Sequence, residues 1–220
     1  QLIYQYIREQ RAVSKQDIVI GLGLSLPTIT QNLNNLAELG LIDTSKKISN
    51  TGGRNATAYS YIEKARYAVG LYLNRHHINC VAVDLSGNVI SLIRVRENFD
   101  LNDDNYLRKI GETVEEVKKD TGLSDDRFLG VGIAVQGLIS DDGERVTYGL
   151  TLNFTGVTRA DIAKYIPYHN RLFHDSAAAG YAEVWDRNDL DDAFYLSLSN
   201  SVGGAVIVAN KIFEGERRKS

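Results

Sequence analysis

Amide and hydroxyl side chains recur at helical spacing in the segment that follows Ser25. With 100° of rotation per residue, one side of a helix over residues 26–38 carries Pro27, Gln31, Asn34 and Glu38, flanked by Thr28 and Asn35. Such groups on the free face of a helix can hydrogen bond to base edges in the major groove of DNA. We expect Gln31 and Asn35 to contact adenine-type edges, and Ser25 and Thr28 to contact phosphates. The alternative is an ordinary helix with a solvated outer face.

Three short helices are expected to position these side chains. The first has an apolar stripe formed by Leu2, Ile3, Tyr6 and Ile7. Ser14 with Asp17 is a capping-box pattern at the start of the second helix, which Gly21 and Gly23 are expected to end. Ser25 is the N-cap of the third helix. The inner faces of the second and third helices are expected to hold Ile18, Val19, Leu22, Leu26, Ile29, Leu33 and Leu36, with Gly40 as the stop.

A cationic hairpin follows the helices. Strand patterns over Leu41–Asp43 and Ala58–Ile62 flank two lysines and the turn Thr51–Arg54. Paired glycines let the backbone approach the duplex while the Arg54 guanidinium enters the minor groove. The order of helices and hairpin predicts a winged helix-turn-helix domain over residues 1–64. The predicted DNA-contacting residues are Ser25, Pro27, Thr28, Gln31, Asn35 and Arg54.

Charge is distributed unevenly along the chain. Residues 1–64 hold 7 Lys/Arg against 5 Asp/Glu, a net charge of +2, whereas residues 65–220 hold 18 against 23, a net charge of −5. The positive charge therefore lies in the candidate DNA-binding domain. One cysteine, Cys80, excludes an intrachain disulfide and lies in an apolar run, so we expect it to be buried. With no run long enough to span a bilayer and no leader pattern, we expect a cytoplasmic protein without membrane contact.

Residues 65–220 predict an α/β domain with a mixed sheet. Strands are expected over Ala68–Leu73, Ile78–Leu85 and Val89–Val95 as an antiparallel meander, then over Phe128–Val135, Phe194–Leu198 and Ala205–Val208, with Val202, Gly203 and Gly204 in the turn between the last two. Helices are expected over Tyr106–Lys119, Arg159–Tyr165 and Ser176–Glu183. The chain stops in a charged stretch typical of an internal loop, so we expect it to be truncated at the C-terminus.

Five motifs occur in the order typical of one family. They are Thr51–Arg54, Gly132–Gly137, Leu152–Gly156, His174–Ala179 and Asn200–Ala205. On these motifs the chain resembles the ROK family (repressor, open reading frame, kinase), in the branch that includes the xylose and N-acetylglucosamine repressors. The resemblance implies an actin-like, ribonuclease H-like sugar-kinase domain over residues 65–220, in a homodimer or homotetramer. The family's structural zinc would lie beyond Ser220, so no metal site is expected within this chain.

The resemblance also shows where the phosphate-binding chemistry of a ROK kinase is altered. Such kinases hold Mg-ATP with a glycine turn after the first strand, together with an aspartate and a threonine. Tyr72 stands at the aspartate position, His76 stands at the threonine position, and Asn74 and Arg75 fill the glycine positions. These bulky side chains are expected to block a triphosphate. A second turn keeps Asn200, Ser201, Gly203 and Gly204, either as an anion-binding turn or as a tight hairpin.

By the same resemblance, the sugar-binding residues are Gln136, Gly137, Asn153, His174 and Asp175. Polar side chains at strand ends suit a polyhydroxyl ligand. Asp175 matches the family's catalytic base, which takes a proton from a sugar hydroxyl. Without ATP, the same carboxylate would accept hydrogen bonds from the sugar, and it would also cap the helix that starts at Ser176. His174 replaces a usual asparagine and Gln136 a frequent proline, and both departures affect which ligand fits.

These features predict a sugar-responsive repressor that binds operator DNA and has no catalytic activity. The alternative is an ATP-dependent ROK sugar kinase with a fused DNA-binding domain and Asp175 as its base. A third possibility is a repressor that has lost its ligand response, against which the retained Asn153 and Asp175 argue. The sequence names neither the sugar nor the operator.

Overall fold

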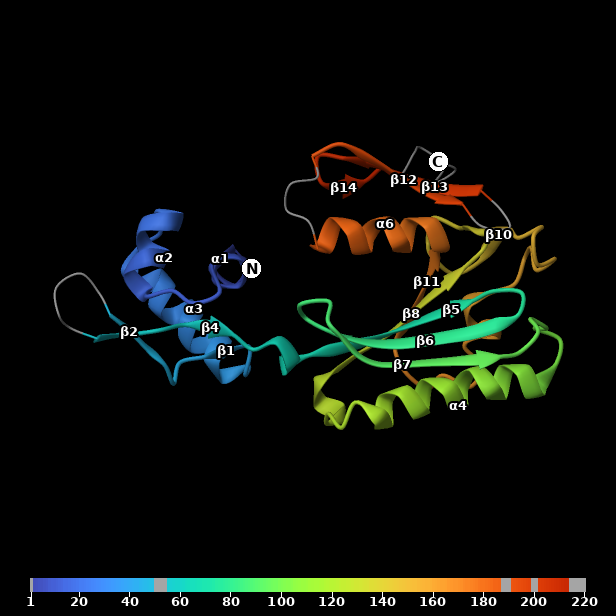
Figure 1. Cartoon of the computed structure of the whole chain (residues 1–220), viewed down its shortest axis with the longest axis horizontal. Coiled ribbons are helices and arrows are strands. Elements are labelled where there is room, and N and C mark those ends of the chain that lie inside the picture. Colours follow the sequence, from blue (N-terminus) through green and yellow to red (C-terminus); the bar gives the residue numbers. More distant parts are fainter. Residues whose placement is uncertain (1, 50–54, 187–190, 199–201, 214–220) are drawn as a thin grey trace. The chain divides into compact units, whose positions relative to one another are not determined.

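The computed structural model describes residues 2–49, 55–186, 191–198 and 202–213. It divides into two compact units, Gln1–Arg66 and Tyr67–Ser220, and each unit has its own hydrophobic core (Figure 1). Two groups of residues singled out above lie outside the described residues: the turn Thr51–Arg54, which includes the predicted DNA contact Arg54, and the turn residues Asn200 and Ser201.

Three helices form the start of the first unit. They are α1 (Leu2–Gln10), α2 (Lys15–Leu22) and α3 (Leu26–Glu38). The capping box predicted for α2 is confirmed: the Ser14 hydroxyl accepts a hydrogen bond from the Asp17 N–H, and the Asp17 carboxylate accepts one from the Ser14 N–H at 2.8 Å. Ser25 caps α3 through the Thr28 N–H. The buried core of the unit comprises Ile3, Ile7, Val13, Ile18, Ile29, Leu33 and Ile42.

Short antiparallel strand pairs follow α3. β1 (Ile42–Asp43) pairs with β4 (Ser60–Tyr61), and β2 (Lys47–Ser49) pairs with β3 (Asn55–Thr57). An isolated bridge between Val13 and Tyr59 attaches this ribbon to the segment between α1 and α2. A single 3-10 turn, η1 (Glu63–Ala65), ends the unit.

Two sequence-based expectations for this unit are wrong. Gly21 does not end α2 but lies inside it, where a Cβ would collide with the Tyr6 ring, so glycine serves the close approach of α1 and α2. The helix ends instead at Gly23, whose φ of 63° is left-handed. Leu26 is not buried but 55% exposed, because it opens the first turn of α3, ahead of the part that packs into the core at Ile29.

The second unit is built on a five-stranded mixed sheet. The predicted antiparallel meander is confirmed as β5 (Tyr67–Leu73), β6 (His77–Asp84) and β7 (Val89–Arg96), with β8 (Phe128–Val135) and β11 (Asn170–His174) parallel to β5, in the order β11-β8-β5-β6-β7. The helices α4 (Asp104–Asp120) and α6 (Asp175–Asp186) lie on opposite sides of this sheet (Figure 1). Cys80 is fully buried in β6, as expected, and burial raises the pKa of its thiol to about 12. It is therefore an inert core residue.

Smaller elements complete the second unit. A 3-10 turn, η2 (Asp125–Arg127), precedes β8; the hairpin β9 (Leu138–Ile139) and β10 (Val146–Tyr148) follows it; and α5 (Arg159–Ile162) precedes β11. A three-stranded antiparallel sheet, formed by β12 (Ala193–Leu198), β13 (Val202–Val208) and β14 (Lys211–Ile212), packs on α6.

Two expectations for these smaller elements are also wrong. The helix predicted up to about Tyr165 ends earlier, at Ile162, and residues 163–165 form a turn. Gly203 and Gly204 do not lie in a turn but in β13, opposite Ser197 and Leu196. A Cβ at Gly204 would come within 2.7 Å of the Phe194 ring, so this glycine serves close packing within the sheet.

Lys118 is a buried cation on the inner side of α4. Its Nζ donates to Tyr168 Oη at 2.8 Å, lies 3.1 Å from Asp125 Oδ1 and sits 3.9 Å from the centre of the Tyr168 ring. Lys118→Met keeps the aliphatic stem and removes these contacts, so we expect the free energy of unfolding to fall by about 2 kcal/mol. Urea denaturation measures this value. The control is Lys119→Met on the exposed side of α4, which should change stability by less than about 0.5 kcal/mol. Equal stability of the two variants would contradict a stabilising role for the cation.

Candidate functional site

Three parallel strands end side by side at one edge of the five-stranded sheet. Their register aligns Leu73 of β5, Val135 of β8 and His174 of β11. The next residue of each segment therefore emerges at the same edge. Open α/β sheets bind ligands in the crevice outside the carboxyl ends of their strands. The residues that the register gathers there are Asn74, Gln136, His174 and Asp175, of which the last three were predicted to bind sugar.

Asp175 joins β11 to α6 without an intervening loop. Its Oδ1 accepts a hydrogen bond from the Ser176 N–H at 2.8 Å and lies 3.4 Å from His174 Nε2. The carboxylate therefore accepts one of the N–H groups in the first turn of α6, which have no partner within the helix. Within the described part of the chain, its hydrogen bonds all end on Oδ1, which leaves Oδ2 for a ligand. Because the side chain is 25% exposed, a ligand can reach it.

Tyr72 lies beside Gln136 at this edge. Its hydroxyl accepts a hydrogen bond from Gln136 Nε2 at 3.2 Å. Burial raises the pKa of Tyr72, and the neighbouring negative charge of Asp175 raises it further. In the sequence, Tyr72 was interpreted only as an obstacle to a triphosphate, and its place among the candidate sugar-binding residues was missed. No local signal in the sequence could have found it, because the contact depends on the parallel register of β5 and β8, in which Tyr72 lies opposite Ala134 and Gln136 follows two residues further on.

Asn153 lies on the loop Gly149–Gly156 rather than on a strand. It is exposed and has a left-handed φ of 54°, which asparagine tolerates better than most residues. Phe154 is buried and anchors the loop: a Cβ at Gly149 would come within 2.9 Å of its ring, and one at Gly137 within 3.3 Å. Gly137 is thus buried against this loop and offers a ligand only its backbone. Among the described side chains, Asn153 makes no hydrogen bond to the other predicted sugar-binding residues.

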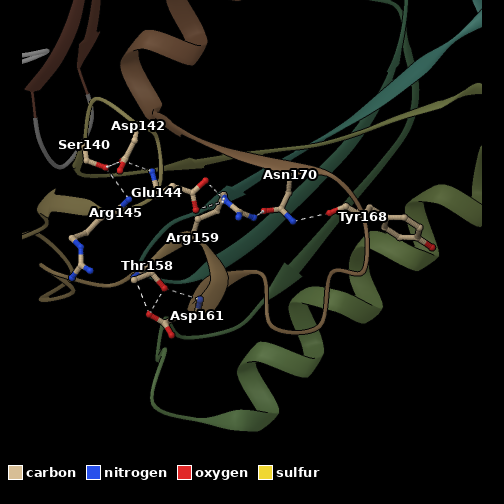
Figure 2. A network of polar contacts seen from close by, with 9 residues as sticks. All are labelled: Ser140, Asp142, Glu144, Arg145, Thr158, Arg159, Asp161, Tyr168 and Asn170. Carbon is tan, nitrogen blue, oxygen red and sulfur yellow. Dashed lines mark hydrogen bonds and ion pairs between the residues drawn. The ribbon is translucent and has the colours of Figure 1, made fainter.

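A polar network fixes the segments around this loop (Figure 2). Arg159 donates to both carboxylate oxygens of Glu144 at 2.9 Å and to Asn170 Oδ1 at 2.7 Å. Arg145 donates to the Gly156 carbonyl at 3.0 Å. The other members of the network are Ser140, Asp142, Thr158, Asp161 and Tyr168. These contacts join the β9–β10 hairpin to α5 and to the first residue of β11. They therefore fix segments that lie next to the candidate sugar-binding residues in the sequence.

The turn after β5 satisfies its own backbone groups. Asn74 Oδ1 accepts hydrogen bonds from the His76 N–H at 3.0 Å and from the His77 N–H at 2.9 Å. Arg75 Nη2 donates to the Thr151 carbonyl at 2.8 Å. A phosphate-binding turn needs backbone N–H groups that point at the anion. Two such groups are already engaged here, so the turn is poorly suited to a triphosphate.

In the first unit, the candidate DNA-contacting residues described by the structure are exposed. They are Ser25, Pro27, Thr28, Gln31 and Asn35. The Ser25 and Thr28 hydroxyls share a hydrogen bond of 2.8 Å, whereas Gln31 and Asn35 lie one turn apart on the free surface of α3. The helix contains no lysine or arginine, so its exposed face offers amides and hydroxyls rather than cations.

Comparison with known proteins places this architecture. The ROK family model matches residues 68–218. The xylose repressor of Bacillus subtilis (strain 168) is 21% identical over 220 residues, which cover 97% of this chain and 56% of that protein. The crystal structure of a ROK family transcriptional regulator, a homolog of the E. coli MLC protein, gives a TM-score of 0.74 at 18% identity over 98% of this chain and 55% of that chain. A ROK family glucokinase from Streptomyces griseus, in complex with glucose and AMPPNP, gives 0.57 at 18% identity over 69% and 47%.

The chain spans about half the length of the curated relatives it matches. Across the described ranges, no helix has the length and apolar character needed to cross a membrane. Nor do three or more His, Cys, Asp or Glu side chains of described residues gather as potential metal ligands. The family model covers more than half of the chain, including the five-stranded sheet and Asp175. As its motifs indicated, the chain belongs to the ROK family.

Proposed function

We propose that this chain is a sugar-responsive transcriptional regulator, in the simplest case a repressor, which binds operator DNA through residues 1–64 and does not phosphorylate its ligand. Residues 65–220 would bind the sugar. A pair of chains would present two α3 helices to a pseudo-palindromic operator. Sugar binding would then alter DNA affinity by favouring one arrangement of the pair over the other.

The proposal depends chiefly on the exposed polar face of α3. It is supported by the similarity of nearly all of this chain to a transcriptional regulator. The regulator structure matches 98% of this chain, which takes in most of residues 1–66, whereas the glucokinase structure matches 69%. Helices α2 and α3, joined by residues 23–25 and followed by β-ribbons, have the element order of a winged helix-turn-helix. The side of α3 that carries Gln31 and Asn35 is then the surface that would enter the major groove.

Two features of the second unit support a role without phosphoryl transfer. The turn at which the kinases hold ATP phosphates is closed here, because Asn74 accepts two of its N–H groups. Tyr72 replaces the aspartate of the kinases and hydrogen bonds to Gln136 instead. Phosphoryl transfer depends on electrostatic stabilisation of the phosphates in addition to a base. Asp175 can serve as a base, but it does not stabilise the negative charge of the phosphates.

A neutral sugar suits the candidate site. The Asp175 carboxylate, the Gln136 amide and the Tyr72 hydroxyl offer both acceptors and donors to hydroxyl groups. Because several relatives are named xylose repressors, D-xylose is the first ligand to test.

Thermal unfolding against a panel of sugars, with and without Mg-ATP, tests the proposal. We expect one sugar to raise the midpoint and Mg-ATP to leave it unchanged, since a ligand at 100 times its Kd adds about 2.7 kcal/mol to stability. Stabilisation by Mg-ATP, or ATP-dependent phosphorylation of the sugar, would favour the alternative, a ROK sugar kinase in which Asp175 Oδ2 accepts the hydroxyl proton. No response to any sugar would contradict the sensing role and leave DNA binding to be tested separately.

A further inference from the structure

The loop Gly149–Gly156, which carries Asn153, is attached to the fold through the Gly156 N–H, which donates to the Val146 carbonyl at 2.8 Å, and through three side chains. Phe154 anchors it from inside, between Gly137 and Gly149. Arg145 holds its end through the Gly156 carbonyl at 3.0 Å. Arg75 holds its beginning through the Thr151 carbonyl at 2.8 Å. Two arginines from different parts of the chain thus grip opposite ends of one short loop.

The backbone of Arg75 is itself firmly placed. Its carbonyl accepts a hydrogen bond from the Phe99 N–H at 3.1 Å, and the residue lies in the turn that Asn74 closes. The Phe99 ring in turn meets the Phe154 ring edge-on, with 5.2 Å between ring centres. Phe99 therefore links the backbone of Arg75 to the internal anchor of the loop. The Arg75 guanidinium adds a second connection, its hydrogen bond to the Thr151 carbonyl. A charged donor makes a stronger hydrogen bond than a neutral one.

We propose that Arg75 is a positioning residue of the proposed sugar site, which holds the loop Gly149–Gly156 so that Asn153 is presented to the ligand. The Asn153 N–H donates to the Leu150 carbonyl at 3.3 Å, so the peptide that Arg75 grips lies inside the same tight turn. That turn keeps Asn153 at a φ of 54°, a conformation that needs support from its surroundings. A segment whose family counterpart serves phosphate binding would thus serve the ligand loop here.

This inference rests on the proposed function, but its first test needs no ligand. Hydrogen exchange of the full chain is followed in peptides that cover residues 149–156, for the unaltered protein and for Arg75→Ala, Arg75→Lys and Arg96→Ala. Arg96 is an exposed arginine of β7 and serves as the matched control, because within the described structure it makes no hydrogen bond to the loop. We expect about tenfold faster exchange in the loop for Arg75→Ala, partial rescue by Arg75→Lys and no change for Arg96→Ala.

A double-mutant cycle then connects the loop to the ligand. The probe is the sugar that stabilises the unaltered protein in the thermal screen, with D-xylose first, and calorimetry measures its Kd. We expect Arg75→Ala and Asn153→Ala each to weaken binding by about tenfold. Because Arg75 acts through Asn153, the double variant should bind no more than about twofold more weakly than Asn153→Ala alone.

The outcomes separate the two proposals. Unchanged loop exchange in Arg75→Ala overturns the positioning role whatever the sugar result. Fully additive losses in the cycle overturn it too, since they would show that Arg75 does not act through Asn153. If the unaltered protein binds no sugar while Arg75→Ala loosens the loop, the proposed function fails and the structural role of Arg75 stands.

Discussion

Asp175→Ala is expected to abolish the response to sugar and to weaken sugar binding by about 100-fold. The carboxylate would accept hydrogen bonds from ligand hydroxyls through Oδ2, and each hydrogen bond to a charged group contributes about 1.5–3 kcal/mol. Alanine has no acceptor, so the ligand hydroxyls would lose these hydrogen bonds. DNA binding should persist, because Asp175 lies in the second unit and the candidate DNA-contacting residues lie in the first. Calorimetry with the sugar and a gel-shift assay with operator DNA measure the two effects.

The alanine variant also removes a structural contact, so a second variant is needed. Oδ1 of Asp175 accepts a hydrogen bond from the Ser176 N–H at the start of α6, and loss of this hydrogen bond costs about 1 kcal/mol. Asp175→Asn retains a side-chain carbonyl for this N–H, removes the negative charge and replaces the acceptor Oδ2 by an NH2 donor. We expect it to unfold close to the midpoint of the unaltered protein and still to bind sugar about tenfold more weakly. A sugar response that survives in both variants would place the ligand elsewhere.

Gln31→Ala and Asn35→Ala are each expected to weaken operator binding by about 10- to 100-fold. An amide that forms a bidentate pair with an adenine edge contributes about 1–3 kcal/mol of discrimination. Both side chains are exposed and lack contacts with the core, so stability should stay within about 0.5 kcal/mol. DNA selected by the unaltered protein from a random pool supplies the operator, and fluorescence anisotropy measures the affinity.

The salt dependence distinguishes base contacts from general attraction. Loss of a base contact should weaken binding to the selected operator and leave the slope of affinity against salt unchanged, whereas loss of a phosphate contact lowers that slope. The matched control is Gln5→Ala, an exposed amide of α1 whose side chain bonds to Glu9. Equal affinity of Gln31→Ala and Gln5→Ala for the operator would contradict the proposed role of α3.

Local signals in the sequence located most of the helices and the strands of the meander, but not the contacts between them. Ser14 and Ser25 each accept a hydrogen bond from an N–H group three residues further on, so the local sequence pattern was enough to locate both helix starts. The meander β5–β6–β7 followed from strand periodicity and short turns. By contrast, Tyr72 meets Gln136 across 64 positions and Arg75 meets Thr151 across 76. Such pairs depend on strand register and on how a loop folds back, which no local pattern encodes.

Glycines illustrate the same limit. Gly21 was expected to end a helix and Gly204 to lie in a turn, since glycine is common at both kinds of position. Both instead lie within regular elements and make room for an aromatic ring of another segment. The identity of that ring is a property of the packed chain, and only the structure reveals it.

Because α6 follows β11 without a loop, a movement of Asp175 would be passed directly to the start of the helix. Asp175 is the first residue of α6, and the 12 residues of the helix extend about 18 Å from it. A tilt of about 5° at the carboxylate would displace the far end by roughly 1.6 Å. Trp185, the single tryptophan of the chain, stands at that far end next to Gly87 of the β6–β7 hairpin. We expect the fluorescence of Trp185 to change if ligand binding at Asp175 tilts α6, so that the movement can be followed without a label.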